Sequence, residues 1–184
     1  MTGVQTCALP IFVPEERLGR GAVPDMSLSD NVLLSLLTPL TIRAGFIRNS
    51  VLVQRAADII RRFNVKAAGP HAAARSLSGG NLQKYIVGRE VLRGPKVLIV
   101  AQPTWGVDVG AAAQIRAELV ALRDAGCALL VISEELDELF EIADRLVVIA
   151  KGRVSPPIAT REATVALIGQ YMSGMWDHAE AAHG

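Results

Sequence analysis

Three short apolar runs, separated by stretches with helical spacing, constrain the fold of this chain more than any other feature of its sequence. The runs are KVLIVA at 96–101, CALLVIS at 127–133 and RLVVIA at 145–150. Between them we expect a helix at about 111–124 and a short acidic helix at 134–144. Continuous apolar runs are typical of strands buried on both faces, and helical crossovers join such strands in parallel. The sequence therefore predicts an α/β fold with a mostly parallel sheet.

Before these runs the chain reads as a loop and two helices. Residues 12–26 are rich in glycine, proline and charge, which indicates a strand end followed by a structured loop. Ser27 or Ser29 is expected to cap the helix that follows. A second helix is expected at 50–63, with four apolar residues near one face: Val51, Ala56, Ile59 and Phe63.

Apolar spacing also predicts which residues face inward near the C-terminus. The helix at 111–124 is expected to turn Ile115, Leu119 and Leu122 inward. After a turn at Gly152 we expect a short strand around 153–155. A last helix is expected to pack on the domain with four apolar residues at helical spacing: Val165, Ile168, Met172 and Met175.

The first eleven residues, MTGVQTCALPI, share no periodicity with the rest of the chain. They lack the positive start and long apolar centre of a signal peptide. Ala8 to Ile11 match the translation of a sequencing-adapter oligonucleotide. We therefore expect segment 1–11 to be adapter-derived, the alternative being a genuine terminus, and we expect the natural protein to extend upstream.

Bulk composition excludes several classes of function. The net charge is +1, so no basic excess points to nucleic acid. The apolar runs are far shorter than the roughly 20 residues that a membrane-spanning helix needs. Cys7 and Cys127 lie far apart, which suggests neither a disulfide framework nor a metal site and favours the reducing cytoplasm.

The segment LSGGN at 77–81 carries the chemistry of this sequence. It opens a helix, and the apolar run at 96–101 and the turn PTWGVD at 103–108 follow it. Glycines at a helix start expose backbone N–H groups, which together with the helix dipole favour a phosphate oxygen. An S-G-G before a helix also fits a simple helix cap, but the combination with the strand, the turn and the second strand favours a phosphate site.

These motifs resemble those of ATP-binding cassette (ABC) ATPases. LSGGN resembles their signature motif, AQPTWGVDVGA (101–111) their Walker B end and D-loop, and PEERLGRGAVPDMSLSDN (14–31) the stretch after their Q-loop. The resemblance covers residues 12 to about 176. It is closest to the second nucleotide-binding half of double-cassette importers of simple sugars and nucleosides. It implies a partial P-loop NTPase-type α/β domain with an α-helical subdomain.

The resemblance implies that this half has lost its own catalytic groups. Ala101 and Gln102 take the places of the Mg²⁺-linked aspartate and the water-orienting glutamate. Glu15 takes the place of the Q-loop glutamine, and Glu134 that of the switch histidine. Gln102 cannot act as a general base, and the two glutamates bring negative charge towards a triphosphate. We expect no catalytic residue in cis and no metal ligand.

The resemblance assigns the intact signature to a partner's nucleotide. In this family two cassettes pair head to tail, and each ATP lies between the Walker motifs of one and the signature of the other. We therefore expect four residues to bind the γ-phosphate of an ATP held by the partner: Ser78, Gly79, Gly80 and Asn81. Asp108 would lie in the D-loop at the interface, with an Asx turn or a helix N-cap as its equally compatible alternative.

The resemblance also implies an organisation and a setting. The expected divisions are an adapter-derived segment 1–11, a Q-loop region 12–26, a helical subdomain 27–75, an ABC core 76–157, and a C-terminal helix and tail 158–184. The expected cofactors are ATP and Mg²⁺, held mainly by the partner cassette. The expected partners are a first cassette half, transmembrane permease subunits and, indirectly, an extracytoplasmic solute-binding protein. The setting would be the cytoplasmic face of the membrane, without nucleic acid.

Other functions and other residues fit less well. A soluble ABC-type ATPase of DNA repair or chromosome organisation needs coiled-coil heptads or a basic surface, which the sequence does not show. A non-catalytic structural cassette half remains an open alternative. A dehydrogenase fits less well because this sequence lacks the G-x-G-x-x-G motif of that class. Lys84 and Tyr85 are expected at an interface or a solvated face, Trp105 in the turn, and the acidic run 134–141, apart from Glu134, on a solvated helix face. Three histidines show no metal spacing: His71, His178 and His183.

Overall fold

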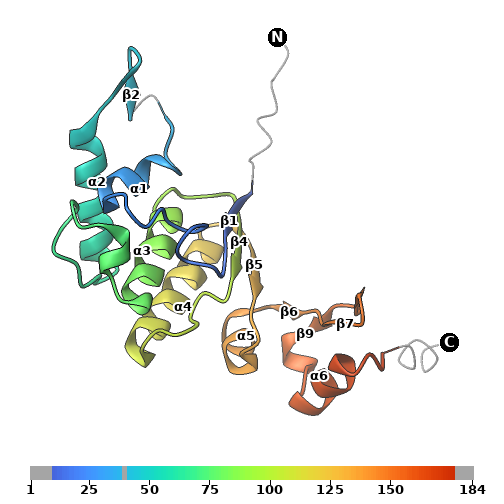
Figure 1. Ribbon diagram of the computed structural model, residues 1–184. Coiled ribbons are helices and arrows are strands. Elements are labelled where there is room, and N and C mark those ends of the chain that lie inside the picture. The colour runs from blue at the N-terminus through green and yellow to red at the C-terminus, as the bar shows by residue number, and fades with distance from the viewer. Residues whose placement is uncertain (1–9, 39–40, 177–184) are drawn as a thin grey trace, which may run out of the picture. The chain divides into compact units, whose positions relative to one another are not determined.

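A computed structural model describes residues 10–38 and 41–176 of the chain (Figure 1). The expected adapter-derived segment lies outside these residues except for Pro10 and Ile11, and Ile11 begins the first strand. The chain forms two compact units, with the boundary between Ile132 and Ser133. The LSGGN segment therefore belongs to the first unit and Glu134 to the second.

A three-stranded parallel sheet forms the centre of the first unit, in the order β1-β4-β5. Its strands are β1 (Ile11–Val13), β4 (Val97–Ala101) and β5 (Ala128–Ile132). The register aligns Phe12 with Ile99 and Ile99 with Leu130. The predicted parallel α/β arrangement is confirmed for these strands, and their carboxyl ends lie at one edge of the sheet.

Two helices cover one face of this sheet (Figure 1). They are α3 (Gly79–Val91), which packs on β1, and α4 (Val109–Asp124), which packs on β5. Leu98 and Val100, on the covered face, are fully buried. On the other face Leu130 and Ile132 are 48% and 46% exposed. The prediction that β5 is buried on both faces is therefore wrong, because both helices lie on the same side.

The α4 helix confirms most of its predicted inward face. Ile115 and Leu119 are fully buried, and Leu122 is partly exposed. The helix begins two residues earlier than expected because Asp108 caps it, accepting a hydrogen bond of 2.8 Å from the backbone N–H of Ala111. The N-cap alternative for Asp108 is thus confirmed.

Residues 27–76 contain the other helices of the first unit. The elements are α1 (Leu28–Leu33), the hairpin strands β2 (Ile42–Arg43) and β3 (Phe46–Ile47), α2 (Asn49–Arg62) and a 3₁₀ turn (Ala74–Ser76). Ser27 caps α1 by accepting a 3.0 Å hydrogen bond from the N–H of Asp30, which confirms one of the two predicted caps. Near one face α2 buries Leu52 where Val51 was expected, because positions 52, 56, 59 and 63 follow the helical repeat more closely.

The second unit consists of short elements. They are α5 (Leu136–Ile142), β6 (Arg145–Leu146), β7 (Ile149–Ala150), β8 (Arg153–Val154), β9 (Ile158–Ala159), a 3₁₀ turn (Thr160–Glu162) and α6 (Val165–Met172). The prediction that the run at 145–150 forms a further parallel strand is wrong. This run splits into β6 and β7. These pair antiparallel with β9 and β8. Lys151 and Gly152, with φ of 50° and 73°, close the β7–β8 hairpin, so a local turn takes up the apolar run.

Two expectations for side chains of the second unit are wrong. In α6 the buried residues are Ile168 and Tyr171, and the ring of Tyr171 lies 5.9 Å from that of Trp176. The other three residues of the expected apolar face are exposed: Val165, Met172 and Met175. In the acidic run 134–141 Glu138 is buried, because it shares a face of α5 with the buried Ile142 four residues later.

Candidate functional site

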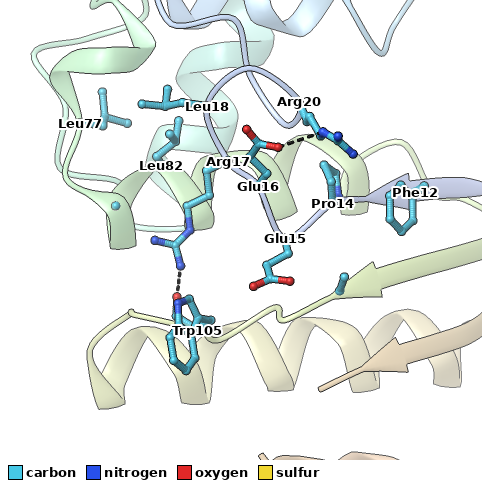
Figure 2. A pocket seen from close by; sticks show the side chains of 12 residues that line it. Phe12, Pro14, Glu15, Glu16, Arg17, Leu18, Arg20, Leu77, Leu82 and Trp105 are labelled. Carbon is cyan, nitrogen blue, oxygen red and sulfur yellow. Dashed lines mark hydrogen bonds and ion pairs between the residues drawn. The ribbon is translucent and has the colours of Figure 1, made fainter. Parts of the chain in front are cut away.

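Three segments of the first unit line an open cleft of about 900 Å³ at the carboxyl edge of the sheet (Figure 2). They are the loop after β1 (14–20), the signature turn, defined as residues 77–81, and the turn at 102–107 after β4. Glu15, Gly79 and Ala101 all line this cleft. The structure therefore brings together three positions that lie far apart in the sequence.

The signature turn presents the start of α3 without a side-chain cap. Ser78 occupies the N-cap position, but its hydroxyl makes no hydrogen bond to the backbone of the first turn. Instead, Nδ2 of Asn81 donates a 2.8 Å hydrogen bond to Oγ of Ser78, and Oδ1 of Asn81 accepts one of 2.8 Å from the N–H of Lys66. Because the first intrahelical bond is donated by Leu82, the three preceding amides stay available to a ligand.

Other helices of the chain show what a simple cap looks like. Ser27, Asp108 and Thr164 each accept a hydrogen bond from the backbone three residues later. Ser78 is at the same position of its helix and does not do so. Its arrangement is thus unlike the simple cap that the S-G-G sequence also allowed.

The two glycines of the turn lie close to neighbouring segments of the first unit. A Cβ atom at Gly80 would lie 3.4 Å from the Cα of Val107, and one at Gly79 would lie 2.8 Å from Nη1 of Arg17. The first distance is an ordinary close contact, and the second would require the guanidinium to move. Glycine at position 80 lets the start of α3 lie against Val107, and glycine at position 79 leaves room for the guanidinium of Arg17.

The end of β4 carries no carboxylate. Ala101, the last residue of β4, is partly exposed, and Gln102 is buried with a φ of 49°. A left-handed conformation costs a residue other than glycine roughly 1 kcal/mol. It is held here by a 2.7 Å hydrogen bond from the N–H of Gln102 to the carbonyl of Ile132. The backbone is thus strained at Gln102, the residue expected from the resemblance to replace a catalytic glutamate.

The two glutamates expected at degenerate positions are both exposed. Glu15 points from its loop into the cleft (Figure 2). Glu134 belongs to the second unit, where it lies just before α5. The structure therefore brings Glu15 and Ala101 to one cleft.

Asp108 lies at the end of the 102–107 turn and is fully exposed. The hydrogen bond from the N–H of Ala111 lowers the pKa of Asp108, and the positive charges of Lys84 and Lys66 lower it further. Asp108 thus carries a negative charge near neutral pH.

Sequence reasoning missed two residues that connect the segments of this cleft. Nε of Arg17 donates a 3.0 Å hydrogen bond to Oε1 of Gln83, and its Nη2 donates to the carbonyl of Trp105. Nε2 of Gln83 donates to the carbonyls of Gln102 and Pro103 at 3.3 and 3.1 Å. Nearly all of α3 is buried, so no apolar repeat distinguishes Gln83 from its neighbours in the sequence.

Some other expectations for this region are wrong or fall outside it. Lys84 and Tyr85 are buried rather than solvated, because α3 runs through the middle of the unit. Lys84 donates a 2.7 Å hydrogen bond to the carbonyl of Asn64, and the hydroxyl of Tyr85 donates to that of Leu28. Trp105 lies in the 102–107 turn, as expected, and its side chain is 53% exposed. His178 and His183 lie outside the described residues.

Metal-binding and membrane-spanning features can be checked over residues 10–38 and 41–176. Within these ranges, no three His, Cys, Asp or Glu side chains are grouped so that they could hold a metal ion. In the same ranges, no helix combines the length and the apolar character needed to cross a bilayer.

Comparison of the sequence with curated proteins identifies import ATP-binding proteins as relatives. The nucleoside import ATP-binding protein NupA of Lactococcus lactis subsp. cremoris is 40% identical over 163 residues, which are 88% of this chain and 32% of that protein. A putative ribose/galactose/methyl galactoside import ATP-binding protein of Agrobacterium fabrum is 44% identical over 153 residues, which are 83% of this chain and 30% of that protein. The chain thus spans about a third of the length of the curated relatives it matches.

Comparison with solved structures identifies the same fold. The ATP-binding cassette MJ0796, solved as a dimer in a post-hydrolysis state with ADP and Pi, matches with a TM-score of 0.69 and 20% identity. The match covers 83% of this chain and 63% of that one. No protein-family model matches the chain. The sequence relatives and the shared fold confirm the resemblance seen in the motifs: the chain belongs to the ATP-binding cassette (ABC) family.

Proposed function

We propose that this chain donates a signature turn to an ATP held by a partner cassette, within the ATP-hydrolysing protein of an ABC importer. The observation that carries this proposal is the arrangement of Ser78, whose hydroxyl is held by Asn81 rather than spent on capping α3. The amides of the first turn and the Ser78 proton are thereby free to act as donors.

The residues of the signature turn fit a phosphate group. The backbone N–H groups of Gly79, Gly80 and Asn81 would donate to the γ-phosphate oxygens, and the hydroxyl of Ser78 would add a fourth donor. Bound ATP supplies the phosphoryl group that is transferred to water. The turn stabilises the negative charge of that group because its donors are fixed before the reaction begins.

The chain's own nucleotide site does not fit Mg²⁺ or hydrolysis. Ala101 ends β4 with a methyl group, and the side chain of Gln102 cannot accept a proton as a general base. By the family resemblance, Glu15 takes the place of the Q-loop glutamine and Glu134 that of the switch histidine, so two carboxylates replace groups that would face this half's own nucleotide. The partner cassette would therefore hold both the ATP and its Mg²⁺, and this half would contribute from across the interface.

The setting of the chain follows from the names of its relatives. They are import ATP-binding proteins for nucleosides, for ribose, and for ribose or galactosides. We infer that the transported solute is a simple sugar or a nucleoside. The chain would work at the cytoplasmic face of the membrane, with permease subunits as direct partners and a solute-binding protein as an indirect one.

The experiment that tests this proposal is substitution within the signature turn of the assembled importer. Ser78→Arg would fill the turn with a bulky side chain, so we expect it to abolish ATP hydrolysis coupled to transport. Ser76→Arg is the matched control, because Ser76 is exposed two residues away and bonds to the carbonyl of Ala73. Circular dichroism of both variants checks folding.

The same experiment distinguishes the proposal from the remaining alternative, a structural cassette half whose signature has no role. Unchanged turnover in a folded Ser78→Arg variant would show that this half is a structural partner without a role for its signature. Loss of turnover in both variants would show that the site tolerates no added charge nearby, which would contradict a specific role for Ser78.

A further inference from the structure

Arg17, in the loop after β1, lies against the signature turn. Its guanidinium lies beside Gly79, where a Cβ atom would approach Nη1 to 2.8 Å, and beside Gly106, where one would approach Nη2 to 3.4 Å. Figure 2 shows this side chain extending from its loop towards the carbonyl of Trp105. Arg17 therefore lies between the signature turn and the 102–107 turn.

Two hydrogen bonds in different directions fix this position. Nε of Arg17 donates to Gln83 on α3 at 3.0 Å, and Nη2 donates to the backbone carbonyl of Trp105. A guanidinium holds its donors in one rigid plane, so both bonds can form only in one orientation of the side chain. The loop after β1 is thereby attached to α3 and to the turn at the same time.

Gln83 completes the connection from the side of the helix. Its side chain is 1% exposed and has both of its polar atoms engaged. Oε1 accepts from Arg17, while Nε2 donates to the carbonyls of Gln102 and Pro103. A buried amide with complete partners is costly to disturb, so the start of α3 and the 102–107 turn are held as one piece.

The charge of Arg17 favours a role in binding an anion over a role in stabilising the fold. A cation near the N-terminus of a helix opposes the helix dipole, which favours an anion at that end. Partial burial of Arg17 lowers its pKa, so its charge is held there against a desolvation cost that the carboxylate of Glu15 partly offsets. This arrangement becomes favourable when a phosphate occupies the turn.

We propose that Arg17 is a positioning residue for the signature turn: it fixes the turn against residues 102–107 through Gln83 and the carbonyl of Trp105, and it adds a positive charge beside Gly79 at the start of α3. This inference rests on the proposed function of the turn. It extends that function by connecting the loop after β1 to the phosphate site through specific hydrogen bonds.

The test separates position from charge in steady-state ATP hydrolysis by the assembled importer. Arg17→Lys keeps the charge but cannot form both hydrogen bonds, so we expect kcat to fall roughly tenfold while KM for ATP stays within about twofold. Arg17→Met removes the charge as well, so we expect KM to rise in addition to the loss in kcat. Gln83→Glu keeps the acceptor for Arg17 and removes both donors to the turn, so its kcat should fall as in Arg17→Lys.

A control and a reference variant complete the experiment. Arg75→Met removes an exposed arginine that pairs at 2.6 Å with the exposed Asp25, and it should leave kcat and KM unchanged. Wild-type kcat and KM in both Arg17→Lys and Gln83→Glu would overturn the role of Arg17, even if Arg17→Met did not fold. Ser78→Arg, measured alongside, separates the two proposals: if it hydrolyses ATP normally, the function of the turn itself is wrong.

Discussion

The side-chain amide of Asn81 donates a 2.8 Å hydrogen bond to the hydroxyl oxygen of Ser78. Since this bond uses an acceptor site of the hydroxyl, the Ser78 proton is left to be donated elsewhere. The orientation of Asn81 is fixed in turn by the N–H of Lys66, which donates to its carbonyl oxygen. Asn81 thus orients Ser78, and its own backbone amide belongs to the open first turn of α3.

Replacing Asn81 by aspartate should reverse this arrangement. A carboxylate accepts hydrogen bonds and donates none. The aspartate would therefore accept a hydrogen bond from the Ser78 hydroxyl, and its charge would repel a phosphate. We expect kcat/KM for ATP in the assembled importer to fall about a hundredfold, as for the loss of an oxyanion donor. Asn64→Asp adds the same charge at an exposed position outside the turn and should have little effect. Equal losses in the two variants would contradict the role of Asn81.

Local patterns in the sequence predicted local structure well. The apolar runs at 96–101 and 127–133 form parallel strands, and Ser27 and Asp108 cap helices as expected. These features depend on neighbouring residues, since a strand needs its own apolar run and a cap needs the amide three residues later. The family resemblance came from spacing along the chain and was confirmed by the relatives.

Features that depend on distant residues could not be predicted. The attachment of Arg17 to Gln83 joins residues that are 66 positions apart, and neither stands out by periodicity. The exposure of Leu130 arises because both covering helices lie on the other face of the sheet. The run at 145–150 is apolar like a parallel strand, but the tight turn at Lys151 and Gly152 pairs it locally. In each case tertiary arrangement overrides the local pattern.

Gln102→Ala should leave ATP turnover almost unchanged. The family resemblance places Gln102 at the position of a general base, and an amide cannot take a proton, so we expect that its removal costs no catalytic group. Alanine also accepts a left-handed φ about as poorly as glutamine, so the strain at 49° stays the same. We expect kcat of the importer within about twofold of the unmodified protein. A large loss, with Ser78→Arg as the inactive reference, would mean that Gln102 takes part in the reaction.

Glu90 should make the stability of the first unit depend on pH. Its side chain is 3% exposed and binds Arg89 and Arg93, each at 2.7 Å, and the hydroxyl of Ser35 at 2.5 Å. Burial alone raises the pKa of Glu90, but the charge of Arg89 and the hydrogen bonds outweigh it, so the pKa is lowered. The stabilisation is therefore complete above the pKa of the unfolded chain and is lost as pH falls through the lower, folded value.

Urea unfolding of Glu90→Gln between pH 7 and pH 3 measures this contribution. Removing one partner of a buried ion pair leaves the arginines uncompensated, so we expect a loss of about 3 kcal/mol at pH 7 that shrinks as the solution is acidified. Glu16→Gln breaks the exposed pair of Glu16 with Arg20 and should change little at any pH. A loss for Glu90→Gln that stays constant with pH would show that the carboxylate charge is not responsible.

Gly88→Ala should destabilise the chain although alanine is the better helix former. Gly88 lies inside α3, and a Cβ atom there would approach Cδ2 of the fully buried Phe63 to 2.6 Å. Overpacking of this kind costs about 1–3 kcal/mol, and the gain in helix propensity is about 1 kcal/mol. Because the ring is enclosed and cannot move aside, we expect a net loss of roughly 1–2 kcal/mol in denaturant unfolding.

Gly169→Ala in α6 is the control: the added Cβ atom meets no atom within 4 Å, so this change should stabilise the chain by up to about 1 kcal/mol. Adding Phe63→Leu to Gly88→Ala should recover part of the loss, since a smaller side chain makes room for the methyl group, and strict additivity of the two changes would contradict the predicted contact.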